Sequence, residues 1–123
     1  MENVGQIILS QLKTLSLNSL MAWGAQKFTT FNQGQLITEP HIGGLMFKVH
    51  GLKHKGHVVI TLNGKDLYDL RIGKYTKHRF EQTGVTIKDL YAEDLIEAID
   101  NQIEGYFENG SKIYENIDLF KNI

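Results

Sequence analysis

The stretch 57-HVVITLNGKDLYDLRI-72 decides the fold. Residues 57–62 are rich in β-branched side chains, and residues 67–72 alternate apolar with polar side chains, which is typical of strands. Asn63-Gly64 lies between the two runs. A type I′ turn needs positive φ at both central residues, and Asn-Gly tolerates this best. The stretch therefore predicts an antiparallel hairpin that turns at Asn63-Gly64.

Strand patterns continue on both sides of this hairpin. Leu45, Phe47 and Val49 alternate with the residues between them, as in a strand. Residues 74–80 extend the second strand beyond a bend at Gly73, and residues 27–31 and 35–38 fit another hairpin. We therefore expect an antiparallel meander of four or five strands.

Helical spacing flanks the strands. Residues 4–22 carry an apolar stripe that ends before Gly24, although residues 17–21 fit either a continued helix or a turn. Thr86 and Asp89 resemble a capping box for a C-terminal amphipathic helix. The apolar face of this helix comprises Ala92, Leu95, Ile96, Ile99, Ile103 and Tyr106. Strands between helices indicate an α+β fold, with the C-terminal helix packed on one face of the sheet.

The 123 residues fit a single α+β domain over residues 1–108. Asn109-Gly110 interrupts the helical pattern, so residues 109–123 form a tail: a docking helix, a partner-binding segment or a frayed end. Without cysteine, the chain has no disulfide, no Cys zinc site and no thiol catalysis. No signal peptide is recognised and no run approaches the roughly 20 apolar residues of a membrane span, so we expect a cytoplasmic protein.

Three segments resemble one group of proteins. Residues 21–28 (MAWGAQKF), 59–70 (VITLNGKDLYDL) and 90–95 (LYAEDL) are similar to the patterns M-x-G-A-K-x-F, I-T-L-N-x-x-D-x-Y-D/N and V-Y-A/N-D-M-L. These patterns are found in small bacterial proteins encoded by phages, plasmids and conjugative elements. The resemblance spans residues 21–99, whereas the five histidines and the residues beyond Phe107 depart from it. It implies the context of a mobile element and no particular chemistry.

His50, His54 and His57 are spaced as His-x3-His-x2-His. Imidazole nitrogens bind zinc or copper, so the three side chains are candidate metal ligands. A strand–turn–strand pattern does not make them converge, however, and no Glu lies between residues 40 and 65. We therefore expect three histidines of an exposed basic turn, and neither a metal nor another cofactor.

Basic residues gather in the strand region. Residues 41–79 hold eight Lys or Arg against Asp66 and Asp69, a formal charge of +6, and residues 80–123 carry ten acids against three Lys, a formal charge of −7. With Tyr68, Tyr75 and Phe80 nearby, a basic sheet surface would bind nucleic acid. Lysines also protect edge strands from aggregation. The candidate nucleic-acid-binding residues are Lys48, Lys53, Lys55, Lys65, Arg71, Lys74, Lys77 and Arg79.

Trp23 is either a lid over the core or, with Tyr114 and Phe120, part of a partner-binding surface. Asp69 has candidate ion-pair partners in Arg71 and in a cross-strand Lys. No Gly-x-Ser-x-Gly elbow or phosphate loop is present, so we expect no enzyme. The sequence favours an accessory protein of a mobile element that acts by protein–protein interaction or self-association. Nucleic-acid binding through the basic sheet is the alternative.

Overall fold

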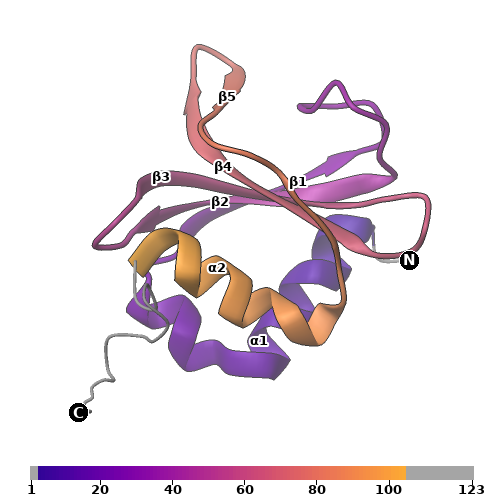
Figure 1. Cartoon of the computed structure of the whole chain (residues 1–123). Coiled ribbons are helices and arrows are strands. Elements are labelled where there is room, and N and C mark those ends of the chain that lie inside the picture. Colours follow the sequence, from indigo (N-terminus) through magenta and orange to yellow (C-terminus); the bar gives the residue numbers. More distant parts are fainter. Residues whose placement is uncertain (1–2, 105–123) are drawn as a thin grey trace.

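Two helices cover one face of an antiparallel sheet (Figure 1). The computed structural model describes residues 3–104. Its elements are α1 (Val4–Ala22), β1 (Gln26–Asn32), β2 (Gly43–His50), β3 (Lys55–Leu62), β4 (Tyr68–Thr76), β5 (Arg79–Gln82), β6 (Ile87–Leu90), the short η1 (Ala92–Asp94) and α2 (Leu95–Glu104). The predicted α+β fold is confirmed, with a helix at each end of the strand region. Residues 105–123, and with them the predicted tail, lie outside the described part.

The sheet has the order β1-β2-β3-β4-β5, and β6 also pairs with β4. Its six strands exceed the expected four or five, because residues 79–82 and 87–90 each form a separate strand that pairs with β4. The expected capping box of Thr86 and Asp89 is therefore wrong. The helical region begins after Tyr91, whose backbone N–H donates to the Asp94 carboxylate at 3.4 Å.

The central hairpin of β3 and β4 is confirmed, but its predicted type I′ turn is wrong. Leu62 pairs with Tyr68, so five residues connect the strands. The Asn63 side chain accepts the backbone N–H groups of Lys65 at 2.8 Å and Leu67 at 3.2 Å. Asp66, not Asn63 or Gly64, has a positive φ, of 68°. A side chain that bonds to nearby backbone thus replaces the tight turn.

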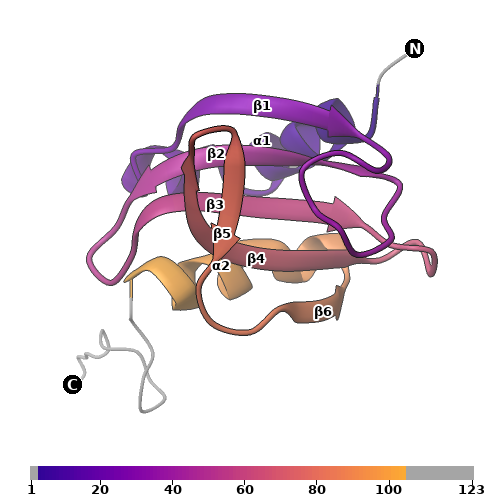
Figure 2. The ribbon, with the colours of Figure 1, turned by 90° about the horizontal axis from the view of Figure 1, so that it is seen from above.

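The expected strand over residues 35–38 is also wrong. β1 pairs with β2, where Phe31 lies opposite Gly44, and residues 33–42 form a loop that lies over the sheet (Figure 2). Ile37 of this loop is buried against Phe31, Met46 and Val59. The apolar residue that resembled a strand position is thus held by packing on the sheet.

Side-chain alternation gives the sheet two different faces. The helix-covered face carries the main core, in which α1 and α2 pack on Phe47, Ile60 and Leu70. Trp23 belongs to this core: it is 1% exposed, and its indole N–H donates to Asp100 Oδ1 at 2.9 Å. The other face, which we call the helix-free face because neither described helix covers it, carries a smaller apolar cluster.

The predicted N-terminal helix is confirmed, with a kink. Asn3 and Gln6 form a capping box at its start. Ser16 leaves helical geometry (φ −167°, ψ 87°), and its hydroxyl accepts the Ser19 N–H at 3.2 Å, as an N-cap does. The chain turns into β1 at Gly24, where φ is 66°. Within residues 3–104, neither helix combines the length and the apolarity needed to cross a membrane.

Candidate functional site

The helix-free face is partly covered by two projections, the loop of residues 33–42 and the β4–β5 hairpin (Figure 1). Between them lies the small apolar cluster, with Met46 and Val59 from the sheet and Phe80 from the hairpin. Two pockets lined by charged side chains flank this cluster. Both pockets thus open on the helix-free face of the sheet.

The first pocket lies where β4 curves away from the sheet into the β4–β5 hairpin (Figure 1). We call it the basic pocket. Its volume is about 380 Å³. None of the described residues that line it is acidic, and they are Lys48, Val49, His50, Lys55, Gly56, His57, Lys74, Tyr75 and Thr76. The register explains this grouping, because Lys48 pairs with His57, and His50 with Lys55.

His57 is held in place within the basic pocket. Its Nδ1 accepts the backbone N–H of Tyr75 at 3.2 Å, and the two rings meet edge to face with centroids 5.9 Å apart. Burial lowers the pKa of His57, and the charges of Lys48, His54 and Lys27 lower it further. Because Nδ1 accepts a hydrogen bond, the neutral ring carries its proton on Nε2. The pocket thus combines cationic side chains with a neutral ring.

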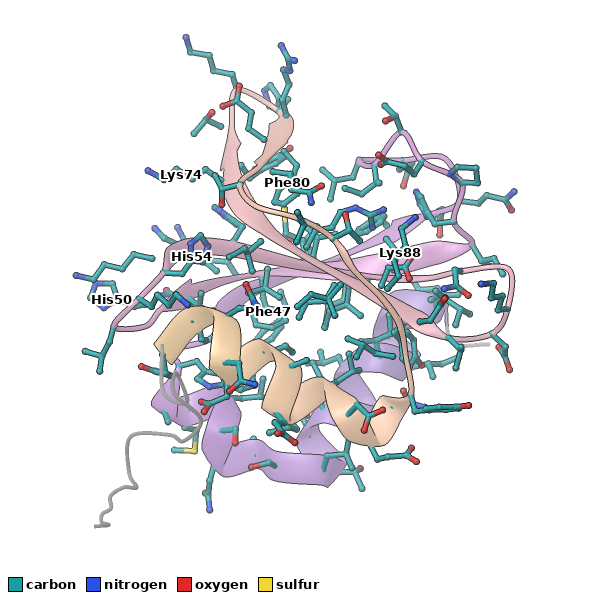
Figure 3. All side chains as sticks on the ribbon, in the orientation of Figure 1. Phe47, His50, His54, Lys74, Phe80 and Lys88 are labelled. Atoms are coloured by element: carbon teal, nitrogen blue, oxygen red, sulfur yellow. The ribbon has the colours of Figure 1, made fainter. Side chains whose placement is uncertain are left out.

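The three histidines lie near one end of the sheet, where Figure 3 labels His50 and His54. His54 Nε2 lies 3.4 Å from the backbone oxygen of His57, and His57 Nδ1 is taken by Tyr75. Within residues 3–104, no group of three or more His, Asp or Glu side chains is placed to hold a metal ion. Only His54 lies in the turn between β2 and β3, whereas His50 ends β2 and His57 is a half-buried residue of β3.

The basic candidates separate into three groups. Lys48, Lys55 and Lys74 surround the basic pocket. Lys53 is exposed in the turn between β2 and β3, and Lys77 and Arg79 are exposed on the β4–β5 hairpin. The other two, Lys65 and Arg71, line the second pocket.

Two of these candidates are unsuited to a nucleic-acid interface. Lys65 pairs with Asp89 at 3.1 Å, and Arg71 is only 3% exposed, too deeply buried to touch a polymer. Tyr68 also faces the helices, where its hydroxyl donates to Gln11 at 2.6 Å. Sequence reasoning missed Lys27, whose charge acts on His57. Lys27 follows Gln26, which pairs with Lys48. The nearness of Lys27 to His57 therefore follows from the strand register and not from the sequence.

The second pocket, which we call the mixed-charge pocket, has a volume of about 370 Å³. Its lining is Glu39, Pro40, Asn63, Gly64, Lys65, Asp69, Arg71, Lys88 and Asp89. The expected pairing of Asp69 with Arg71 or a cross-strand Lys is wrong. Asp69 Oδ1 instead accepts the Asn63 side-chain amide and the Asp89 backbone N–H, both at 3.0 Å.

Of the three candidate partner-binding residues, only Trp23 lies within the described part of the chain. Trp23 is the predicted lid over the core, and a side chain buried to this extent has no surface to offer a partner. Tyr114 and Phe120 lie outside the described residues. The large apolar side chains that α1 does expose include Leu15, Leu17 and Met21.

Comparison of the chain with protein-family models, with curated proteins and with solved structures finds no match. Function depends on the residues of a site and not on the fold that carries them. The basic pocket has the chemistry to bind a polyanion: its lysines neutralise phosphates, and its rings offer surfaces to a base.

Proposed function

We propose that this protein is a non-enzymatic nucleic-acid-binding protein that binds single strands across the basic pocket. The observation that carries the proposal is the convergence of Lys48, Lys55 and Lys74 on a pocket of about 380 Å³ without an acidic side chain among its described lining residues. An accessory role in a mobile element and a cytoplasmic location stay predictions from the sequence.

Electrostatics supplies the affinity. Lysines that neutralise phosphates release counterions, so binding weakens as salt rises. Three contacts predict a slope of about −2 for log affinity against log salt on a single strand. Exposed Lys53, Lys77 and Arg79 extend the positive surface along the neighbouring turn and hairpin.

Aromatic rings favour single strands over duplexes. Tyr75 and His57 line the same pocket and are fixed by the bond between Tyr75 N–H and His57 Nδ1. An unstacked base gains about 1–3 kcal/mol from an aromatic face, whereas paired bases in a duplex do not present theirs. Because His57 is neutral, its Nε2–H is a hydrogen-bond donor for a base edge or a phosphate.

The experiment is fluorescence anisotropy of labelled single- and double-stranded DNA and RNA at low and physiological salt. The triple variant Lys48→Glu/Lys55→Glu/Lys74→Glu is compared with Lys13→Glu/Lys65→Glu/Lys88→Glu, which makes the same charge change at exposed lysines outside the basic pocket. We expect the first variant to lose affinity for single strands at least about tenfold at low salt, and the second to lose much less. Equal losses, or no binding by the parent protein, would refute the proposal.

Protein–protein interaction is the second candidate, favoured by the exposed apolar residues of α1. Leu17 and Met21 are one helical turn apart, and Met21 is 70% exposed. If this surface joins two copies, Leu17→Gln/Met21→Gln will dissociate an oligomer seen by sedimentation velocity. Truncation after Asn109 tests the tail in the same assay. A parent protein that is monomeric at all concentrations and captures no partner argues against this candidate.

A further inference from the structure

Arg71 is a buried cation with few partners. Its side chain on β4 is 3% exposed, and its Nη1 donates to Thr61 Oγ1 at 3.0 Å. Its Nε is buried without a hydrogen-bond partner among the described residues. A guanidinium has five N–H donors and does not lose its charge in a protein. A buried charge of this kind needs an anion nearby.

Glu39 supplies that anion only loosely. Its Oε1 lies 3.7 Å from Arg71 Nη2, which is too long for a hydrogen bond. The Glu39 side chain is 62% exposed and belongs to the loop of residues 33–42. An ion pair with one exposed partner and no hydrogen bond contributes little. Glu39 is therefore easily displaced from Arg71.

The other carboxylates of the mixed-charge pocket are engaged elsewhere. Asp69 accepts two hydrogen bonds, from Asn63 and from the Asp89 backbone. Asp89 accepts hydrogen bonds from Lys65 at 3.1 Å and from Asn63 at 2.9 Å, and the bond from Lys65 is the main cause of its lowered pKa. Neither aspartate forms an ion pair with Arg71.

Without Glu39, the residues that line the mixed-charge pocket carry one more positive than negative charge. The lining then holds Lys65, Arg71 and Lys88 against Asp69 and Asp89. Lys88 is exposed on β6 and forms no ion pair within residues 3–104. A planar carboxylate matches the geometry of a guanidinium and carries the single charge that balances this set.

We propose that the mixed-charge pocket binds a small carboxylate, which displaces Glu39 and pairs with Arg71, with Lys88 at the rim. Figure 3 shows Lys88 at the opposite end of the sheet from His50 and His54, so this site is separate from the basic pocket. Glu39 then acts as an internal competitor for the ligand. The proposal does not depend on nucleic-acid binding.

The experiment is a titration of the full ¹⁵N-labelled chain with sodium acetate, followed by NMR at constant ionic strength with chloride as the reference. The chain has two arginines, Arg71 and Arg79, so their two Nε–H signals report the site and an internal control. We expect a saturable shift of the Arg71 signal and none of the Arg79 signal. The matched variants Arg71→Met and Arg79→Met remove the same charge, and only the first abolishes binding.

Glu39→Gln gives the decisive comparison. It changes an exposed loop residue, so the proposal stays testable even if Arg71→Met does not fold. We expect acetate to bind more tightly, by up to about fivefold, because an exposed ion pair no longer competes. Unchanged or weaker binding in Glu39→Gln would overturn the proposal, as would the absence of a saturable Arg71 shift. Saturable binding of inorganic phosphate without acetate binding would overturn the assignment to a carboxylate.

Discussion

The two faces of the sheet are made by the same strands and differ in what covers them. On the helix-covered face, α1 and α2 enclose Val58 and Ile60 of β3 in one continuous apolar core. On the helix-free face, Val59 is enclosed by the loop and the hairpin, while His57 lines the basic pocket. Continuous cover by helices favours stability, and incomplete cover leaves charged pockets in which ligands can bind.

The largest expected effect tests this division through two adjacent residues of β2. Phe47 faces the helices and Met46 faces the loop, and both are buried. Phe47→Ala is expected to lower the free energy of unfolding by about 3–5 kcal/mol. Met46→Ala is expected to lower it by about 2 kcal/mol, because the loop of residues 33–42 can settle into the space. Urea unfolding measures both values, and a larger loss for Met46→Ala would reverse the comparison.

A smaller effect concerns the pH dependence of the helix-free face. The pKa of His57 is lowered on folding from 6.5, first by burial and then by Lys48. The unfolded chain therefore binds more protons than the folded chain once the pH falls toward and below 6.5, and stability decreases in that range. His57→Asn has no titrating ring, and its side-chain oxygen can accept the Tyr75 N–H. We expect the variant to lose less stability than the parent between pH 7.5 and about 5.

Urea unfolding at several pH values measures this difference. The parent and the variant are compared by the slope of unfolding free energy against pH, so a uniform loss of stability in His57→Asn does not matter. Identical slopes would show that His57 is not held in its neutral form by the pocket. Phe47→Ala serves as the control on the helix-covered face, because it removes no titratable group and keeps the parent's slope.

The architecture could be predicted from the sequence because the helical and the strand repeats of apolar residues each extend over long segments. Residues 4–22 repeat at helical spacing and become α1, and the alternation around Phe47 and Tyr68 becomes β2 and β4. The prediction of a tight turn is wrong because the Asn63 side chain accepts hydrogen bonds from two backbone N–H groups, in a connection of five residues. β6 has only four residues, too few to show a period, and it forms because β4 offers them a pairing edge.

The candidate sites were predicted less well because they depend on which segments cover the sheet and on which residues pair between neighbouring strands. Lys48, Lys55 and Lys74 were candidates by composition, and the pairing of β2 with β3 and the curve of β4 bring them together. Arg71 was a candidate for the same reason. It is buried instead, since loop residues 39 and 40 join β4 and β6 in lining its pocket. Neither the path of a loop nor a strand register follows from composition.

The bond between Trp23 and Asp100 joins residues 77 positions apart in the chain. The β2–β3 and β3–β4 hairpins, by contrast, close over short turns. Closing a long loop costs more chain entropy than closing a short one, so we expect the hairpins to assemble early and the two helices to meet late. We therefore expect a weakened contact between α1 and α2 to accelerate unfolding and to leave the refolding rate nearly unchanged. With this order of assembly, we expect the helix layer to set the lifetime of the folded protein and the strand meander to set its folding rate.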